Sequence, residues 1–316
     1  MKVISDPAAL DPGPRPVCAA IGVFDGVHLG HQRVLRQTIA NAAQRQAVSV
    51  VVTFDRHPNA VVAHAHVPPL IYPLDKKLDV IASLGVEAAY VIPFDKAFSQ
   101  IPGGQFVRSL ARDFRRLKTI CVGHGFLFGA GRSGNAALLR KLGAELGFTL
   151  DALRDVECDG QSVSSTRIRD AVRAGDFALA GRMLGRPYAL RGTVIQGEHL
   201  GRTLGFPTAN LAVPGLLTPS PGVYAAEAQL GPARHRAAVN IGHRPTVHAT
   251  DPHLHVEAHL LDFNGDLYAR TLELVFLKQL RPEQKFPTPD ALRAQIADDL
   301  AQARAVVAPL IQPSQG

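Results

Sequence analysis

Short, unbroken apolar runs alternate with amphipathic stretches along the first part of the chain. Continuous hydrophobicity over about 4–8 residues is typical of strands buried on both faces of a sheet. Runs of this kind occupy residues 17–23, 48–54, 88–92 and 119–123. Apolar positions at helical spacing predict helices near 30–45, 74–84, 103–113 and 135–147, and two shorter ones near 166–174 and 176–184. This alternation predicts an α/β domain with a parallel sheet.

The pattern changes after Arg186-Pro187, where short strands are separated by frequent turn residues. Alternating apolar positions predict strands at 191–196, 222–228, 237–241, 255–261 and 271–277. Short strands divided by Pro and Gly turns are typical of an antiparallel barrel or sandwich. Asn264-Gly265 predicts a hairpin turn. A helical period that ends near residue 308 predicts a final helix beginning at Thr288 or Pro289.

These patterns divide the chain into residues 1–185 and 186–316, and its length of 316 residues also suits two domains. With 46% hydrophobic and 19% charged residues, the composition is that of a folded protein. Three widely separated cysteines argue against a disulfide framework or a cysteine zinc site. The sequence shows neither the apolar core of a signal peptide nor a run long enough to span a membrane. We therefore expect a cytoplasmic protein with no membrane partner.

The net charge of +7 comes almost entirely from residues before 186. A modest basic excess fits a site for phosphorylated small molecules at least as well as a nucleic-acid surface. A regulatory RNA-binding role would rest on the basic cluster Arg108, Arg112, Arg115, Arg116 and Lys118. Helical spacing favours a solvated face instead, and no aromatic residue interleaves with the cluster to stack on bases. We expect no nucleic-acid partner.

The first candidate site follows the first predicted strand and opens the first helix. It reads Gly22-Val23-Phe24-Asp25-Gly26-Val27-His28-Leu29-Gly30-His31. In an open parallel sheet, phosphates bind at such a turn, because the helix start offers free N–H groups and glycines allow close approach. His28 and His31 lie three apart on one helix face, so both can donate to one phosphate as its charge grows. The alternative is two unrelated surface histidines.

A second candidate anion site precedes a later helix. Ser164, Ser165 and Thr166 stand before Arg167 and Arg169, which combines hydroxyl caps with guanidinium groups. A capped helix with nearby arginines is common by itself, so this element depends on its pairing with the histidines. The string at 129–134 matches Gly-x-Gly-x-x-Gly, but it lies late in the sheet and does not directly follow a strand, which argues against nicotinamide binding.

The second domain carries a glycine-rich loop and a carboxylate. Gly197, Gly201 and Gly205 lead into Pro207, and they indicate a tight turn or a close backbone approach to a ligand. Thr208 and Asn210 follow, and their oxygens suit Mg²⁺ with phosphate. On an alternating strand Glu257 shares one face with His259, and in a barrel mouth it could take a proton from an attacking hydroxyl. Generic barrel turns and a solvated carboxylate are the alternatives.

These elements together resemble the prokaryotic bifunctional riboflavin kinase/FMN adenylyltransferase (FAD synthetase) family. The first domain resembles the nucleotidyltransferase module through residues 22–31 and 164–169. The second resembles the kinase module through Gly201-Arg202-x-Leu204-Gly205-Phe206-Pro207-Thr208-Ala209-Asn210, Gly222-Val223-Tyr224-Ala225, Asn240-Ile241-Gly242-x-x-Pro245-Thr246, Val256-Glu257 and Leu280-Arg281-x-Glu283-x-Lys285-Phe286.

The resemblance implies a Rossmann-like domain followed by a small antiparallel β-barrel with a C-terminal helix. It also implies riboflavin, FMN and ATP as substrates, with Mg²⁺ held by Thr208 and Asn210. Glu257 would be the base of the kinase. His28 and His31 would act in adenylyl transfer, with nucleotide and phosphate contacts from Gly22, Phe24, Asp25, Gly30, Ser164, Ser165, Thr166, Arg169, Gly197, Gly201, Gly205 and Pro207.

The sequence departs from the family pattern at four positions. Gly125 replaces a residue that is usually Asp or Asn, and Leu127 stands where Arg is frequent. Asn135 stands where an acidic residue is common, and Arg56 where proline is usual. Losing one side-chain hydrogen bond at a substrate site costs about 1–3 kcal/mol. The alternative function is therefore a riboflavin kinase whose N-terminal domain is a degenerate nucleotide- or flavin-binding module.

Overall fold

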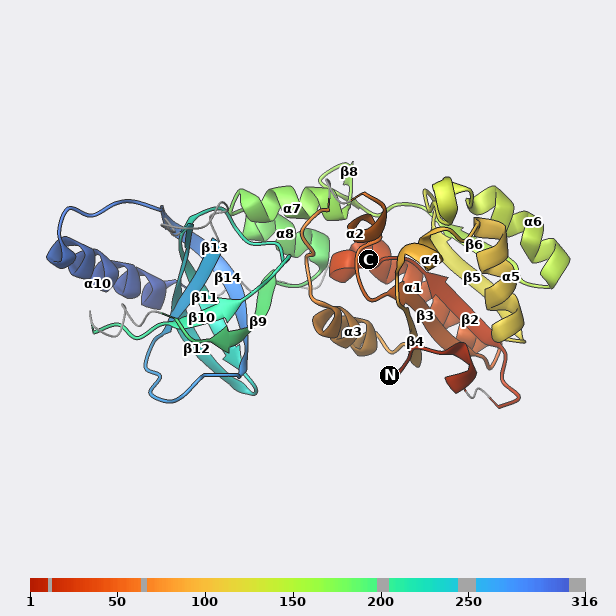
Figure 1. Cartoon of the computed structure of the whole chain (residues 1–316), viewed down its shortest axis with the longest axis horizontal. Helices are drawn as coiled ribbons and strands as arrows, with labels where there is room; N and C mark the ends of the chain where they lie inside the picture. Colours follow the sequence, from red (N-terminus) through yellow and green to blue (C-terminus); the bar gives the residue numbers. More distant parts are fainter. Residues whose placement is uncertain (11–12, 64–66, 198–204, 244–253, 307–316) are drawn as a thin grey trace. The chain divides into compact units, whose positions relative to one another are not determined.

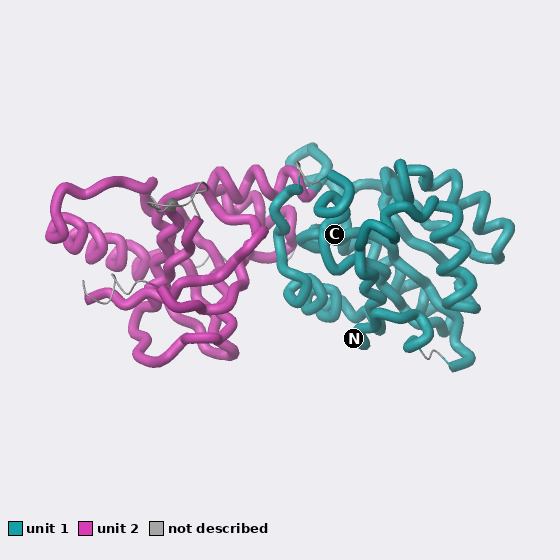
Figure 2. Tube along the Cα trace, in the orientation of Figure 1, with its two compact units in different colours: residues 1–164 teal, residues 165–316 magenta. Residues whose placement is uncertain are grey.

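The computed structural model describes residues 1–10, 13–63, 67–197, 205–243 and 254–306 (Figure 1). The chain forms two compact units, residues 1–164 and 165–316 (Figure 2). Gly201, a predicted phosphate contact, lies outside the described residues.

The first unit is built on a sheet of six parallel strands in the order β1-β4-β3-β2-β5-β6. Every residue of β2 and β3 is buried, as unbroken apolar runs predict. The predicted parallel α/β fold is confirmed, but the edge strands β1 and β6 were not predicted. The strands are β1 (Lys2–Ile4), β2 (Val17–Ile21), β3 (Val48–Phe54), β4 (Ala88–Ile92), β5 (Leu117–Gly123) and β6 (Thr149–Leu153).

Helices cover both faces of this sheet. Phe106 of α5 and Leu139 of α6 belong to the apolar core on one face. Leu35 of α1 and Ile81 of α3 belong to the core on the other face. The longer helices are α1 (Leu29–Gln44), α3 (Leu74–Ser83), α5 (Gly103–Asp113) and α6 (Ala136–Leu146), and the short ones are α2 (Asn59–Val62) and α4 (Lys96–Ser99). The four longer helices lie within a few residues of their predicted positions.

The strand order changes direction between β2 and β5. From β2 the chain continues through β3 and β4 on one side, and it then returns to add β5 on the other side of β2. At such a switch point the loops that leave the two strands diverge, and ligands bind in the crevice at the carboxyl ends. The turn that begins at Gly22 leaves β2 at this point, so the topology places it at the expected ligand crevice.

Two short helices, α7 (Ser165–Arg173) and α8 (Phe177–Leu184), belong to the second compact unit. The Phe177 ring of α8 stacks on Phe276 with ring centroids 5.3 Å apart, and it also stacks on Tyr188 at 6.4 Å. Aromatic packing thus holds this helix against the barrel, whereas the sequence pattern grouped both helices with the first domain. A functional division after residue 185 stays a prediction.

The rest of the second unit is a closed barrel of six antiparallel strands in the order β10-β13-β12-β11-β14-β9. The predicted antiparallel barrel is confirmed. One strand, β10, lies in a stretch that the sequence pattern showed only as a loop. The strands are β9 (Ala189–Ile195), β10 (Ala209–Ala212), β11 (Gly222–Leu230), β12 (Ala233–His243), β13 (Leu254–Leu260) and β14 (Thr271–Pro282).

The predicted hairpin at Asn264-Gly265 is wrong. It would join β13 to β14, but β13 pairs with β10 and β12, and β14 pairs with β9 and β11. The segment is a crossing connection between strands that are not neighbours. A two-residue hairpin turn lies instead at Gly231-Pro232, where Leu230 pairs with Ala233 and Gly231 has a positive φ of 60°.

The last helix, α10 (Pro289–Ala305), packs on the outer surface of the barrel through Ala303, Ala225 and Ala238. Thr288 caps it by accepting from the N–H of Ala291 at 3.2 Å, at the predicted start.

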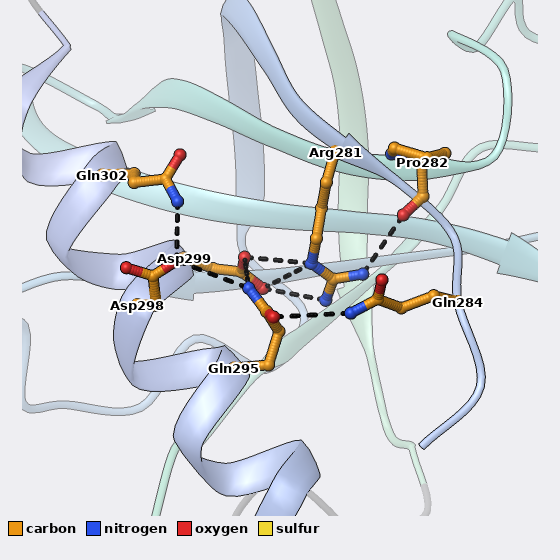
Figure 3. Close-up of polar contacts among 7 residues, drawn as sticks. All are labelled: Arg281, Pro282, Gln284, Gln295, Asp298, Asp299 and Gln302. Atoms are coloured by element: carbon orange, nitrogen blue, oxygen red, sulfur yellow. Dashed lines mark hydrogen bonds and ion pairs between the residues drawn. The ribbon is translucent and has the colours of Figure 1, made fainter.

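Arg281 of β14 holds the helix through a two-pronged ion pair with Asp299, with nitrogen–oxygen distances of 2.9 and 3.0 Å (Figure 3). Gln295 also donates to Asp299 at 3.0 Å. Asp299 is only 3% exposed, so its charge depends on these partners.

We expect Arg281→Met to destabilise the second unit by about 3 kcal/mol, because removing one partner of a buried pair leaves the other charge uncompensated. Hydrogen exchange of the barrel amides, measured in the native state, tests this. The control is Arg304→Met, which breaks another two-pronged arginine–aspartate pair, with Asp262 on an exposed surface. The control should have little effect. Equal protection in both variants would contradict the role given to Arg281.

Candidate functional site

The turn after β2 carries the predicted histidine pair. The 3-10 helix η2 (Asp25–Val27) leads into His28, which is the N-cap of α1. His28 Nδ1 accepts a hydrogen bond from the N–H of His31 at 3.4 Å. In a neutral imidazole this leaves the proton on Nε2, which can donate to a ligand. His28 is therefore oriented by the helix start that it caps.

The two imidazoles form one aromatic stack. The rings of His28 and His31 have centroids 3.6 Å apart, and the Phe24 ring meets His31 edge to face at 5.3 Å. Two glycines make room for the stack. A Cβ at Gly30 would lie 3.1 Å from the His28 ring, and a Cβ at Gly22 would lie 3.1 Å from the Phe24 ring. The arrangement places both histidines at a helix N-terminus, as an anion site requires.

The other predicted contacts of this turn have different environments. The Asp25 carboxylate is buried and accepts from the N–H of Ile71 at 2.9 Å, so it holds the turn to the following segment. The carbonyl of Val163 lies 4.0 Å from a Cβ built on Gly30. The residue before Ser164 thus reaches the start of α1 within the first unit.

The remaining members of the second element begin the second unit. Ser165 and Thr166 form the first turn of α7, and Arg169 follows on that helix. Arg169 is 7% exposed. A helix N-terminus with hydroxyl side chains and a nearby guanidinium has the chemistry of an outer-phosphate site.

The Gly-x-Gly-x-x-Gly string is a packing element. A Cβ at Gly129 would collide with the backbone of Gly103, and a Cβ at Gly134 would overlap the Phe128 ring. Ser133 Oγ accepts from the N–H of Gly103 at 3.0 Å. These glycines bring the loop against the start of α5, so close packing gives them a structural role.

The four departures from the family pattern differ in consequence. Asn135 caps α6 by accepting from the N–H of Leu138 at 3.0 Å, and Arg56 forms an ion pair with Asp55 at 2.8 Å. Leu127 is 52% exposed. A Cβ at Gly125 would meet no atom within 4 Å. A polar side chain would therefore fit at residue 125, and its absence leaves open space rather than a filled contact.

In the barrel, Thr208 and Asn210 lie beside a cavity of about 510 Å³. One wall comes from the segment that leads into β10, and the other from the connection between β13 and β14. The lining residues are Val194, Gly197, Pro207, Thr208, Ala209, Asn210, Ala258, Leu260, Phe263, Asn264, Gly265, Asp266, Leu267 and Tyr268. The segment predicted as a hairpin thus forms part of a candidate ligand cavity.

Strand register places Glu257 between two amides. Asn210 of β10 and Asn240 of β12 both lie directly opposite Glu257 of β13. Directly paired residues share one face of a sheet, with Cβ atoms about 4.5–5.5 Å apart. Val256 and Ala258 on either side are each 1% exposed and point into the barrel. By this alternation Glu257 lies on the outer face of the barrel, not among the side chains of its interior.

The segment that carries Thr208 is tied to the same strand. The carbonyl of Pro207 lies 2.8 Å from His259 Nδ1, and the Phe206 ring meets His259 edge to face at 6.1 Å.

The predicted glycines of this segment have structural roles. Gly197 packs so closely on the Asn210 amide that any Cβ there would collide with it. Gly205 takes a positive φ of 90°, which glycine adopts without strain. Two of the three predicted glycines thus have defined structural reasons.

The donor chemistry at this site fits Mg²⁺ together with phosphate. Magnesium prefers oxygen ligands and keeps several positions for water and substrate phosphates. The Thr208 hydroxyl and the Asn210 amide oxygen are groups of this kind. Among the described residues, there is no group of three or more His, Cys, Asp or Glu side chains that could hold a metal ion. These residues therefore do not form a metal site made of such side chains alone.

None of the three cysteines forms a disulfide bond, and Cys18 and Cys121 are buried. Burial raises the pKa of the Cys121 thiol to about 11. A thiol with so high a pKa is uncharged near neutral pH and is a poor nucleophile. The predicted absence of a disulfide framework agrees with this structure, and Cys121 belongs to the core.

Family models match both parts of the chain. Residues 11–167 match the model for FAD synthetase, and residues 184–307 match the model for riboflavin kinase. The chain is 38% identical over 309 residues to the bifunctional riboflavin kinase/FMN adenylyltransferase of Pseudomonas fluorescens, covering 98% of this chain and 99% of that protein. It belongs to the bifunctional riboflavin kinase/FMN adenylyltransferase family.

Two further proteins are similar to this chain over almost its whole length. The bifunctional riboflavin kinase/FMN adenylyltransferase of Escherichia coli K12 is 38% identical over 306 residues, 96% of this chain and 97% of its own. A crystal structure described as a macrolide-efflux protein from Streptococcus pneumoniae superposes with a TM-score of 0.82 at 28% identity, covering 96% of this chain and 99% of its own. This family member therefore carries both a riboflavin kinase domain and an FMN adenylyltransferase domain.

Two arginines of the basic cluster form ion pairs with nearby carboxylates. Arg108 pairs with Glu145 and Arg112 pairs with Asp113, so part of the cluster is neutralised on an exposed face. Among the residues that the structure describes, no helix is both long enough and apolar enough to cross a bilayer.

We predict that Gly197→Ala lowers riboflavin kinase activity about 100-fold, because its methyl group displaces the Asn210 amide and small misplacements at an active site have effects of that size. FMN adenylylation by the same sample should be unchanged and serves as the control. A kinase rate close to the parental one would show that the contact between Gly197 and Asn210 does not position the amide for the kinase reaction.

Proposed function

We propose that the outer face of the barrel at Asn210, Glu257 and Asn240 is the phosphoryl-transfer site of the kinase domain. The register that brings Glu257 directly beside Asn210 is the observation that carries this proposal. It joins a carboxylate to an oxygen ligand that also borders the cavity of about 510 Å³. The cavity has the size expected of a small-molecule site.

In this proposal the substrates are riboflavin and ATP. Glu257 takes the proton from the ribityl 5′-hydroxyl while that oxygen attacks the γ-phosphorus of ATP, and ADP leaves to give FMN. Thr208 and Asn210 would hold Mg²⁺ and the phosphates, and a bound ion would supply positive charge for the phosphate oxygens. The Asn240 amide, on the other side of Glu257, orients the carboxylate or the attacking hydroxyl. The short tie between His259 and Pro207 keeps Thr208 near Glu257.

Glu257→Gln should lower the rate of FMN formation by about 100–10,000-fold, because an amide of the same shape cannot accept the proton. Conversion of added FMN to FAD should stay at the parental rate, since that reaction belongs to the other domain. The measurement is chromatographic separation of FMN from riboflavin over time. Riboflavin phosphorylation at the parental rate would remove Glu257 from the role of base.

We assign adenylyl transfer to the turn after β2. The FMN phosphate attacks the α-phosphorus of ATP in line with the leaving group, pyrophosphate departs, and FAD results. No protein group forms a covalent bond in this scheme, so catalysis comes from positioning and charge stabilisation. His28 and His31 donate to the α-phosphate oxygens, and the assignment of Ser164, Ser165, Thr166 and Arg169 to the outer phosphates stays a prediction from the sequence. Gly22, Phe24 and Gly30 shape the approach, and Asp25 holds the turn.

The kinase-only alternative rests on the open space at Gly125 and the exposed Leu127. The intact histidine stack and the full-length similarity to bifunctional relatives favour two activities. Because a side chain fits at residue 125, Gly125→Asn is the variant that tests whether the missing amide limits adenylylation.

His31→Ala should lower FMN adenylylation by about 100–1000-fold, the usual effect of removing one donor aimed at developing charge. The maximal rate should fall more than the affinity for ATP, because the interaction tightens in the transition state. Phosphorylation of riboflavin by the same sample is the internal control. A variant that makes FAD from FMN as fast as the parent would overturn the assignment of this turn.

A further inference from the structure

Lys77 of α3 is a buried lysine that neither proposed reaction uses. It is 8% exposed. A buried lysine is unusual unless its ammonium group is paired or fully hydrogen-bonded. Its neighbours are backbone and side-chain oxygens at the end of β3 and in the turn that follows β2.

The Lys77 ammonium donates three hydrogen bonds. Its Nζ lies 2.9 Å from the carbonyl of Phe54, 3.1 Å from the hydroxyl of Thr53 and 3.3 Å from the carbonyl of Val23. The Thr53 hydroxyl itself donates to the carbonyl of Val23 at 3.1 Å. One side chain thus ties α3 to the end of β3 and to the first residues of the turn.

The turn that Lys77 holds has a strained backbone. Phe24 has a φ of 54° and Val27 a φ of 42°, in the left-handed region where non-glycine residues are uncommon. For a β-branched residue such as Val27 this conformation is a true outlier. Such conformations cost about 1–3 kcal/mol each and persist only where surrounding contacts impose them.

Several contacts impose this conformation. The Asp25 carboxylate accepts from the N–H of Ile71, and the Gln32 amide donates to the carbonyl of Val27 at 3.0 Å. Lys77 and Thr53 hold the other end of the turn, at Val23. The ring stack of Phe24, His31 and His28 follows directly from this backbone path, so a shift at Val23 moves the donors of the proposed adenylyl-transfer site.

We propose that Lys77 is a positioning residue for FMN adenylylation, holding the strained turn so that His28 and His31 face the α-phosphate. This rests on the proposed role of the histidine turn. Lys77 touches no reacting atom in the scheme and acts through the Val23 carbonyl.

The protonation state of Lys77 decides how many of these bonds exist. Burial lowers its pKa from 10.5 to about 8, while the carboxylates of Asp25, before α1, and Asp55, after β3, raise it in part. An ammonium has three N–H donors for its three acceptors, and a neutral amine has two. Above about pH 8 the turn therefore loses one of its ties, and adenylylation should slow.

Stability responds to the same titration in the opposite direction. Between pH 8 and 10.5 the folded protein binds fewer protons at Lys77 than the unfolded chain does. The contribution of Lys77 to stability therefore rises with pH across that window. A merely structural lysine would leave activity constant or improving there, whereas a positioning lysine makes adenylylation fall.

The test is Lys77→Met, with Lys76→Met as the matched control on the same helix. In the parent, the rate of FMN adenylylation should decline around pH 8. Lys77→Met should lower kcat at pH 7 by about 10–100-fold with smaller changes in KM, as expected for misplaced groups. It should also abolish the decline near pH 8. Lys76→Met should retain both the parental rate and the parental pH profile, and riboflavin phosphorylation should be unchanged in both variants.

Thr53→Val covers the case in which Lys77→Met does not fold. It removes one acceptor of the ammonium and keeps the shape of the side chain, so the midpoint of the decline should move to lower pH. Parental rate and pH profile in Lys77→Met, or an unmoved midpoint in Thr53→Val, would overturn the role of Lys77. If His31→Ala also keeps the parental rate, the site assignment itself has failed; if His31→Ala is defective, only the inference about Lys77 has failed.

Discussion

Burial of the central strands β2 and β3 on both faces constrains everything else in the first unit. Every position of these strands is inside the core, so polar chemistry can only stand where the strands end. At the reversal of strand order beside β2 the loops that leave the strands diverge, and a helix start supplies N–H groups at the same point. The histidine stack, the strained turn and the buried Lys77 all follow from the need to direct the chain out of that core.

In the barrel, closure of the sheet decides which side chains are available to a ligand. Its interior is filled by alternate residues of each strand, so the other set of side chains must face outward. Asn210, Glu257 and Asn240 belong to that outward set, in register across three strands. The closed sheet thus acts as a rigid frame that fixes a carboxylate between two amides, while α10 covers a neighbouring part of the same surface through Ala225 and Ala238.

Local patterns in the sequence predicted most of the fold. Unbroken apolar runs identified β3 and β4 over their full lengths, and capping chemistry located the start of α10 at Thr288. The strands β1 and β10 were missed because three or four residues are too few to show a periodic apolar pattern. Asn264-Gly265 was misread because turn chemistry says nothing about which strands become neighbours.

The candidate site was predictable where chemistry is concentrated in short motifs. His28 and His31 stand within one such motif, and Thr208 and Asn210 within another. Lys77 and the position of Asn240 beside Glu257 were not predictable in this way. Lys77 reads as an ordinary lysine of an amphipathic helix, and only tertiary structure shows that its ammonium meets oxygens of Val23, Thr53 and Phe54. The register between strands pairs Asn240 with Glu257, and the sequence of a single strand does not predict it.

The central claim is that one chain carries out two successive reactions at two separate sites. The most direct measurement follows the parental protein with riboflavin, ATP and Mg²⁺, with flavins, ADP and pyrophosphate quantified over time. The account predicts that FMN forms first and FAD follows, with one ADP per riboflavin consumed and one pyrophosphate per FAD formed. FMN and ADP without FAD or pyrophosphate would contradict it, because the histidine turn would then not be a working adenylyl-transfer site.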